Sequence, residues 1–295
     1  MRLARAAALP PVNLWPMSTA PETASTSAGP SRADLDFAIE IARAAGNRVL
    51  QLRETGRWEG GMLADVGDQA ADGYLQGVIQ GRYPGDGILS EETVDTPERL
   101  EKHRCWIIDP LDGTKEFSQL RDDWGVHVAL TFGGACGVGV VYLPTQGLLL
   151  WGVAPTVAWE GERVGLEGPA EYVAADDEGP AAPRVTVSRS HTPPWVEEFA
   201  KVIGAGDFVP YGGCGNKTMR LLTGEADLYV HNKGLKEWDT CAPETIARAA
   251  GWFVGKLDGS EHRYNQPDPH NHEYVLCRPA WTERVVAAIG KSGVE

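Results

Sequence analysis

Two carboxylates three residues apart follow a short apolar run near the middle of the chain. The run 106–108 is Trp-Ile-Ile, which is typical of a buried strand, and it leads into Asp109-Pro110-Leu111-Asp112. Pro110 fixes the backbone and cannot donate to a sheet ladder, so both carboxylates can turn to one side with the Leu111 carbonyl between them. Such hard oxygen ligands suit Mg²⁺. The segment predicts a magnesium site, although Asp-Pro-x-Asp-Gly is also an ordinary turn sequence.

A helix start is expected directly after the second carboxylate, at Gly113 and Thr114. Free backbone N–H groups and the helix dipole at such a start favour a phosphate group. Because Mg²⁺ sites commonly combine a few carboxylates with substrate phosphate and water, the two features together indicate a phosphate ester as the ligand.

Three further acids stand at expected ends of helices or strands: Asp68, Glu91 and Asp239. Asp239 alone is explained well enough as the N-cap of a helix with Pro243 in its first turn. Taken together, however, the five carboxylates would repel one another, by about 4 kcal/mol for two unit charges 4 Å apart at an effective dielectric near 20. Two or three Mg²⁺ ions would offset this repulsion and let a phosphate ester approach.

The first half of the chain has the pattern of an α+β fold with a largely antiparallel sheet. Ser31-Arg-Ala-Asp34 resembles a capping box ahead of a helix that reaches Leu52. A second helix is expected from Asp68 to Tyr83, followed by a short strand at residues 88–89. Strands joined by turns are expected at 126–132, 137–143 and 148–153.

The second half alternates strands and helices, which is typical of a smaller α/β domain. After irregular chain at 154–183, the pattern predicts a strand at 184–187, a helix at 195–203, a helix opening at the Gly-rich segment 212–217, a strand at 226–231 and a helix at 239–250. The expected organisation is a disordered tail (1–30), an N-terminal metal-binding domain (31–155), a connector (156–183) and a C-terminal α/β domain (184–295). The tail lacks the apolar run of a signal peptide, and Met17 is an alternative start.

The composition of the chain argues against some classes of binding partner. The chain has 295 residues and a net charge of −14, so it carries no electrostatic footprint for a nucleic-acid polymer or an anionic membrane. No apolar run approaches the ~20 residues of a membrane span. The five cysteines form no Cys-x-x-Cys pair, which favours free thiols and a cytoplasmic location. A monomer or a homodimer is expected.

Several segments carry a family resemblance. Ser90-Glu91-Glu92, Asp109-Pro-Leu-Asp-Gly-Thr114 and Trp238-Asp239, in this order, resemble the inositol monophosphatase superfamily of Mg²⁺-dependent, lithium-sensitive phosphatases. The segments 112–117, 188–191, 212–217 and 238–244 are similar to those of the 3′(2′),5′-bisphosphate nucleotidases, and 263–268 and 277–279 to those of the bacterial CysQ branch. The resemblance implies a layered αβαβα sandwich. It also implies a hydrolase of sulfur assimilation that removes the 3′-phosphate of 3′-phosphoadenosine 5′-phosphate, and often of its 5′-phosphosulfate, with a metal-activated water.

The resemblance also implies a role for each matching residue. The first metal pair is expected on Glu91, Asp109, Asp112 and the Leu111 carbonyl, and the second site is completed by Asp239. Asp68 is expected to bind a further metal and to pair with Thr114 in activating the attacking water. Asp65 remains an alternative to Asp68, because the usual threonine shortly before this position is absent. Contacts to the substrate are expected from Gly113, Thr114, Ser188, His191, Gly213, Lys217 and Asp239.

Other functions stay open on the sequence alone. The same metal site could serve an inositol, fructose-1,6-bisphosphate or histidinol phosphate phosphatase, since a shared site does not fix the substrate. A nucleotide-binding sensor without activity is the alternative outside enzymes. The segment 212–218 is not a P-loop, because Asn216 stands where the glycine before the lysine is required. His270, His272 and Glu273 are expected in an exposed loop.

Overall fold

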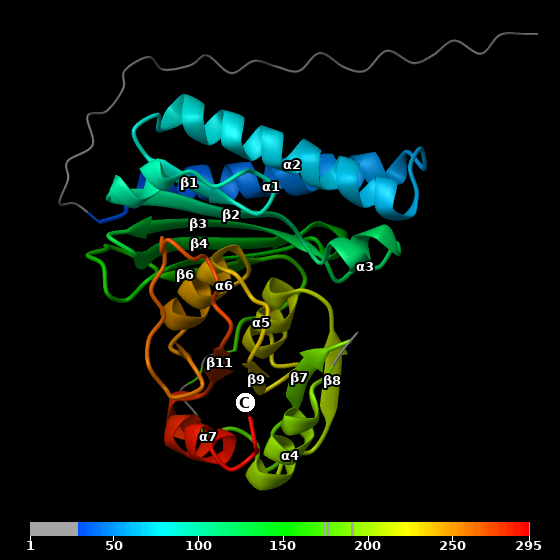
Figure 1. Cartoon of the computed structure of the whole chain (residues 1–295), viewed down its shortest axis with the longest axis vertical. Coiled ribbons are helices and arrows are strands. Elements are labelled where there is room, and N and C mark those ends of the chain that lie inside the picture. Colours follow the sequence, from blue (N-terminus) through cyan, green and yellow to red (C-terminus); the bar gives the residue numbers. More distant parts are fainter. Residues whose placement is uncertain (1–28, 174, 176–177, 190–191, 295) are drawn as a thin grey trace, which may run out of the picture.

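Two β-sheets alternate with three layers of helices along the longest axis of the molecule (Figure 1). The computed structural model describes residues 29–173, 175, 178–189 and 192–294. From one end, the layers are α1 with α2, the first sheet, α5 with α6, the second sheet, and α4 with α7. This is the αβαβα sandwich that the family resemblance implies. Met17 and residues 1–28 of the predicted tail lie outside the described residues.

The first sheet is antiparallel except at one edge. Its strands follow the order β1-β2-β3-β4-β5-β6, and only β1 and β2 run parallel. They are β1 (Gly87–Ser90), β2 (Arg104–Asp112), β3 (Gly125–Phe132), β4 (Ala135–Leu143), β5 (Leu148–Val153) and β6 (Val164–Glu167). The last strand falls inside the segment predicted as irregular connector, so that prediction is wrong at these four residues. β6 is only four residues long, too short for its alternation of Val164 and Leu166 with Gly165 and Glu167 to predict a strand, and it is defined by its pairing with β5.

The second sheet is mixed, in the order β10-β11-β9-β7-β8. β7 runs parallel to both β8 and β9, whereas β11 is antiparallel to both of its neighbours. The strands are β7 (Val185–Ser188), β8 (Phe208–Tyr211), β9 (Leu228–His231), β10 (Phe253–Gly255) and β11 (Tyr274–Cys277).

Helix starts agree with the sequence where a cap marks them. The helices are α1 (Arg32–Glu54), α2 (Gly60–Arg82), α3 (Thr114–Ser118), α4 (Pro194–Ile203), α5 (Cys214–Leu222), α6 (Glu237–Ala249) and α7 (Thr282–Ile289). α1 begins with the predicted capping box: the Ser31 hydroxyl accepts from the N–H of Asp34 at 3.2 Å, and the Asp34 carboxylate accepts from the N–H of Ser31 at 2.8 Å. α2 begins eight residues before the predicted start at Asp68, because Glu59 makes no side-chain cap and Gly60-Gly61 does not signal a helix.

Three hydrophobic clusters fill the spaces between the layers. One lies between the first sheet and α1 with α2, and another lies between the second sheet and α4 with α7. The third joins residues of both sheets to α5 and α6. α6 approaches the first sheet so closely that a β carbon on Gly139 would stand 2.6 Å from the Ala242 carbonyl oxygen, and one on Gly152 would stand 2.6 Å from the Ile246 Cα. α6 therefore packs directly against the backbone of β4 and β5.

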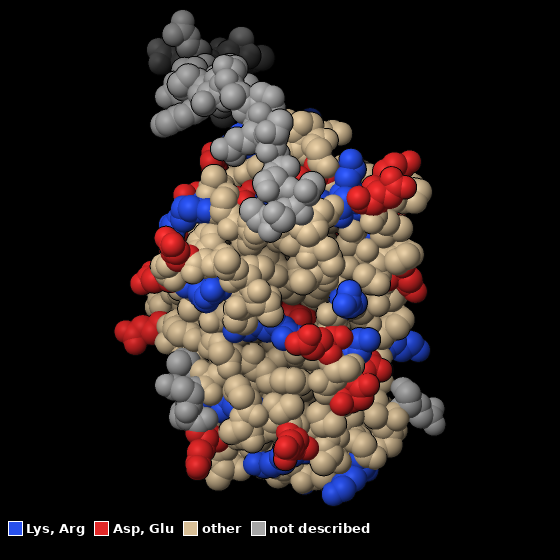
Figure 2. All heavy atoms as spheres, turned by 90° about the vertical axis from the view of Figure 1, so that its left-hand side faces the viewer, with Lys and Arg blue, Asp and Glu red and all other residues tan. Residues whose placement is uncertain are grey.

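Charged side chains of both signs are interspersed on the face shown in Figure 2, with no extended basic area. All five cysteines are buried free thiols, as predicted. Among the described residues, none of the helices combines the length and apolar character needed to span a bilayer.

Candidate active site

Asp109 and Asp112 come together because β2 is irregular at its carboxyl end. Asp109 pairs with His127 of β3 and Asp112 pairs with Gly125, so three steps along β2 match two steps along β3. In a regular strand, residues three apart lie on opposite faces. The extra residue, beside Pro110, resets this alternation as a β-bulge does.

Asp239 completes a tight acidic trio with these two residues. One carboxylate oxygen of each lies within 4.8 Å of the others. Asp239 is the third residue of α6, where its carboxylate accepts from the N–H of Lys236 at 2.6 Å. The prediction that Asp239 is the N-cap is wrong by three residues, because the helix begins at Glu237. Pro243 accordingly lies inside the helix and not in its first turn.

The first two carboxylates of the trio have opposite environments. Oδ1 of Asp109 accepts from the N–H of Leu111 at 3.0 Å, while the buried Oδ2 has no hydrogen-bond partner among the described residues. Burial, with Glu91 and Asp112 nearby, raises the pKa of Asp109 well above its usual value. Burial also acts to raise the pKa of Asp112, but the charge of His127 and a backbone N–H outweigh it and lower that pKa. The protein thus stabilises the ionised carboxylate of Asp112 but not that of Asp109.

The Gly-rich turn before α5 supplies the backbone donors to Asp112. Its two oxygens accept from the N–H of Cys214 at 3.0 Å and of Gly215 at 2.9 Å. Gly213 has φ +64°, and a β carbon there would stand 2.4 Å from Oδ2 of Asp112, so only glycine fits. The amides of Cys214 and Gly215 at this helix start therefore bind an anion, and that anion is a carboxylate of the protein.

Glu91 reaches the site from the neighbouring parallel strand. Ser90 pairs with Ile108, so Glu91 follows β1 at the level where Asp109 follows Ile108 on β2. Glu91 is exposed and lies outside the tight trio. The chain around its carboxylate nevertheless keeps part of the solvent away, and this desolvation, with the charges of Asp239, Glu92 and Asp112, raises its pKa to about 7. Glu91 therefore shares the negative potential of the trio.

Asp68 and Asp65, the two alternatives for one role, differ sharply in environment. Asp68 is buried in the middle of α2, and its Oδ1 has no hydrogen-bond partner among the described residues. Burial and the charges of Glu92 and Glu91 raise the pKa of Asp68 to about 8. Asp65 is exposed. The structure thus favours Asp68 as the residue that could hold a cation.

Thr114 begins the short helix α3 after Gly113, whose φ of +87° is left-handed. Its hydroxyl donates to the Leu111 carbonyl at 3.0 Å. The carbonyl that is expected to hold a metal is therefore also the group that orients the Thr114 hydroxyl.

His127 is a site residue that the sequence analysis missed. Its ring is fully buried, with Nε2 3.1 Å from Oδ2 of Asp112 and Nδ1 3.2 Å from the Trp238 carbonyl oxygen. Burial opposes the charged form, but Asp112 prevails and raises the pKa of His127. The one available signal was a single ionisable side chain in a strand of mostly apolar residues.

The residues expected on the nucleotide side are placed in part. Lys217 is buried on α5, and its charge lowers the pKa of Asp112 and acts in the same direction on Asp239. Ser188 ends β7 and pairs with Tyr211, the residue that precedes Gly212 in the chain. His191 lies outside the described residues.

The residues present fit a divalent cation. Two buried carboxylate oxygens, Oδ2 of Asp109 and Oδ1 of Asp68, have no protein donor in the described part of the chain. Buried acids of this kind either take up protons or bind cations. Asp109, Asp112 and Asp239 are the group that could hold a metal ion.

Comparisons with known proteins find relatives that match most of the chain. The sequence profile of the inositol monophosphatase family matches residues 32–293. The chain is 36% identical over 256 residues to a protein of Mycobacterium leprae named 3′-phosphoadenosine 5′-phosphate phosphatase, covering 83% of this chain and 89% of that protein. It is 30% identical over 242 residues to 3′(2′),5′-bisphosphate nucleotidase CysQ of Escherichia coli O157:H7, covering 78% and 93%.

Solved structures share the fold. CysQ from Bacteroides thetaiotaomicron superimposes with a TM-score of 0.69 at 26% identity, covering 84% of this chain and 97% of that one. Inositol monophosphatase II from Staphylococcus aureus has a TM-score of 0.72 at 20% identity, covering 86% and 92%, a likeness of fold alone. The profile match over most of the chain, together with the identity to these relatives, shows that the chain belongs to the inositol monophosphatase family, whose members are metal-dependent phosphatases.

Proposed function

We propose that the chain is a Mg²⁺-dependent phosphatase that removes the 3′-phosphate from adenosine 3′,5′-bisphosphate and releases AMP and inorganic phosphate. The observation that carries the proposal is the trio Asp109, Asp112 and Asp239, whose carboxylate oxygens lie within 4.8 Å of one another. The choice of substrate is supported by relatives named for this activity at 30–36% identity over most of the chain.

The trio and its neighbours would hold two or three cations. Asp109, Asp112 and Asp239 are the central proposed ligands, and Glu91, the Leu111 carbonyl and Asp68 are the further ones. When bound, the cations supply positive charge for the phosphate ester and lower the pKa of a nearby water. The five carboxylates alone would repel that ester.

Thr114 and Asp68 are the proposed proton relay. A threonine hydroxyl is a poor base by itself, but it can accept a proton while passing its own to a carboxylate. In the structure the Thr114 hydroxyl donates to the Leu111 carbonyl, so the relay requires it to turn toward Oδ1 of Asp68, which has no hydrogen-bond partner among the described residues. Gly113, Ser188, His191, Gly213 and Lys217 remain the proposed contacts to the substrate.

Release of phosphate from two substrates tests the proposal. With Mg²⁺ present, the purified chain should hydrolyse adenosine 3′,5′-bisphosphate with a kcat/KM at least about tenfold above that for inositol 1-phosphate. A tenfold preference for the inositol ester would contradict the substrate. Single-turnover assay of Asp109→Asn provides the control for catalysis. If the chain is an enzyme, the wild type should be active and the variant inactive. If the chain only binds nucleotides, wild type and variant should both be inactive.

We also propose that the enzyme acts in the cytoplasm as a monomer or homodimer. The five buried free thiols fit a reducing compartment. Light scattering on the purified chain measures the oligomeric state.

A further inference from the structure

Asp72 lies on α2 one turn after Asp68 and accepts hydrogen bonds from three side chains. The hydroxyl of Ser90 donates to its Oδ1 at 2.5 Å, and the hydroxyl of Thr93 donates to its Oδ2 at 2.9 Å. The amide of Gln76 donates to both oxygens, at 3.0 and 2.8 Å. Because a carboxylate has about four lone-pair sites, these donors use the full capacity of this buried group. Asp72 thus differs from Asp68, whose Oδ1 has no partner among the described residues.

Two of these donors, Ser90 and Thr93, stand on either side of the proposed metal ligand Glu91 in the chain. Ser90 is the last residue of β1, and the Glu91 side chain that follows it is exposed. Residues four apart on a helix lie on one face. The contact with Asp72 therefore holds the segment that carries Glu91 beside the turn of α2 that carries Asp68.

Little else holds the chain just beyond Ser90. In the part of the chain that the structure describes, residues 92–95 make no backbone-to-backbone hydrogen bond, and Val94 is 87% exposed. Ser90 and Thr93 both line a cavity of about 300 Å³, so close packing does not fix this segment. The hydrogen bonds to Asp72 are what hold it in place.

The far end of the segment is attached to a different helix. Asp95 accepts from Arg99 at 2.6 and 2.7 Å, and Arg99 also donates to residues 265–266 at 2.7 and 2.8 Å. The backbone N–H groups of residues 265–266 in turn donate to Glu237, the first residue of α6, at 2.5 and 2.8 Å. The segment is therefore tied to α2 at one end and, through Arg99, to the helix that carries Asp239 at the other.

We propose that Asp72 is a positioning residue of the metal site, which raises the affinity for Mg²⁺ without binding the ion. It does so by holding the segment of Glu91 against the helix of Asp68, so that both carboxylates are in place before a cation arrives. Residues that orient metal ligands typically contribute about 10–100-fold to metal affinity. The inference rests on the proposed function, since it assumes that Glu91 and Asp68 bind metal.

The test measures Mg²⁺ binding to the purified chain without substrate, from the rise in melting temperature with Mg²⁺ concentration. Asp72→Ala should raise the dissociation constant for Mg²⁺ about tenfold or more. Thr93→Val, at an exposed position, removes one hydroxyl donor without changing the charge, and it should raise the constant about fivefold. At saturating Mg²⁺, phosphate release by both variants should keep kcat within about threefold of wild type, because neither side chain contacts the ester in this proposal.

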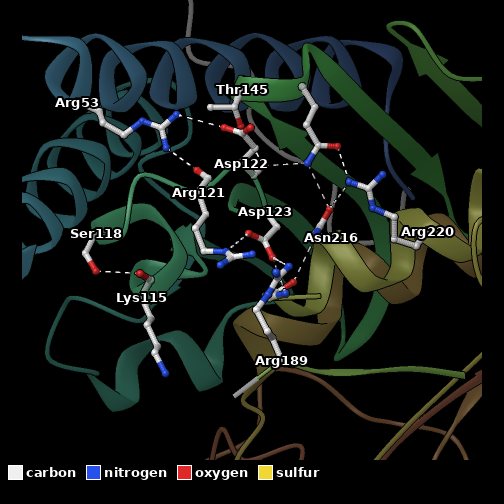
Figure 3. Close-up of polar contacts among 12 residues, drawn as sticks. Arg53, Lys115, Ser118, Arg121, Asp122, Asp123, Thr145, Arg189, Asn216 and Arg220 are labelled. Carbon is white, nitrogen blue, oxygen red and sulfur yellow. Dashed lines mark hydrogen bonds and ion pairs between the residues drawn. The ribbon is translucent and has the colours of Figure 1, made fainter. Parts of the chain in front are cut away.

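Two controls separate this effect from loss of stability and from loss of charge. Asp227→Ala removes another buried aspartate that accepts three hydrogen bonds, all from Arg184, so it should lower the melting temperature and leave the dissociation constant for Mg²⁺ unchanged. Asp122→Ala removes an exposed acid that pairs with Arg53 at 3.7 Å (Figure 3). It should leave that constant within about twofold of wild type.

The outcomes are distinguishable. If Thr93→Val binds Mg²⁺ as tightly as wild type, the hydrogen bonds to Asp72 only stabilise the fold and the inference is overturned, even where Asp72→Ala does not fold. A fall of kcat at saturating Mg²⁺ with unchanged Mg²⁺ affinity overturns it as well. If the wild type shows no response to Mg²⁺, the inference and the proposed function both fail. If it binds Mg²⁺ but prefers another phosphate ester, the proposed function fails and the inference stands.

Discussion

Gly215 lies directly against His127: a β carbon on Gly215 would stand 2.0 Å from Nε2 of the histidine. The same nitrogen lies 3.1 Å from Oδ2 of Asp112, and that oxygen accepts from the N–H of Gly215. Gly215, His127 and Asp112 of the acidic trio therefore all contact one another. Any side chain at position 215 must displace either the histidine or the carboxylate.

Replacing Gly215 by alanine should damage both stability and catalysis. Overpacking at this contact should cost about 1–3 kcal/mol of the free energy of unfolding, and displacement of Asp112 should lower kcat/KM at least about tenfold. Denaturant unfolding and phosphate release measure the two effects. Gly77→Ala is the control, since nothing lies within 4 Å of its β carbon on α2. It should leave activity unchanged and stabilise the protein by about 0.5–1 kcal/mol. Wild-type behaviour of Gly215→Ala would refute this contact.

Asp109→Asn should raise stability without metal and remove the response to metal. The raised pKa of Asp109 shows that its ionised form is disfavoured in the folded state, so a neutral amide relieves repulsion. In EDTA, the variant should melt a few degrees above wild type at pH 7.5. Mg²⁺ stabilises a protein by mass action only where it binds, so adding it should raise the melting temperature of wild type much more than that of the variant. Asp207→Asn, at an exposed position, should match wild type in both conditions, and an equal Mg²⁺ response in Asp109→Asn would argue against the trio as a metal site.

Asp68→Asn and Asp65→Asn decide between the two acids proposed for one role. Asp68 is buried with a free oxygen, whereas Asp65 is exposed. Asp68→Asn should lower kcat about a hundredfold, in the range lost when a general acid or base is removed. Asp65→Asn should keep kcat within about twofold of wild type. The reverse order would assign the role to Asp65.

His262 should make stability depend on pH. Its ring nitrogens lie 2.7 Å from Oε2 of Glu244 and 2.7 Å from the Glu273 carbonyl oxygen, so both face acceptors. Burial opposes the charged ring, but Glu244 raises the pKa of His262 above its usual value. The stabilisation by the charged ring is therefore complete below the unfolded pKa of about 6.5 and is lost as the pH rises through the higher folded pKa.

His262→Gln measures that stabilisation. The substitution should cost about 2–4 kcal/mol of the free energy of unfolding at pH 6 and clearly less at pH 9. Urea unfolding at the two pH values checks it. His103→Gln, at an exposed position, should cost little at either pH. A cost for His262→Gln that does not change with pH would mean that the ring is neutral in the folded protein.

The sequence revealed the residues whose local context is special. Asp109 and Asp112 stand beside a proline and a glycine at the end of an apolar run, so a bend with oxygen ligands could be predicted without knowing the rest of the fold. The capping box at Ser31 and Asp34 was equally local, and the structure confirms it. Each of these signals lies within a few consecutive residues.

What the sequence did not reveal depends on partners far along the chain. His127 is the one ionisable residue of a mostly apolar strand, and its partners Asp112 on β2 and Trp238 on α6 cannot be read from the strand itself. The amides of Cys214 and Gly215 bind Asp112, which lies about a hundred residues earlier in the chain, and no local pattern shows this pairing. α2 lacks a side-chain cap, so Asp68 was predicted at a helix start although it lies well inside the helix.

The position of Asp239 in the acidic trio also depends on Gly139 and Gly152, two residues without a polar side chain. α6 carries Asp239 at one end and rests at these two glycines on the backbone of the sheet. A methyl group at either would lift the whole helix and draw that carboxylate away from its two companions. Loss-of-function variants in this protein should therefore also arise at apolar strand positions that a survey of charged residues would pass over.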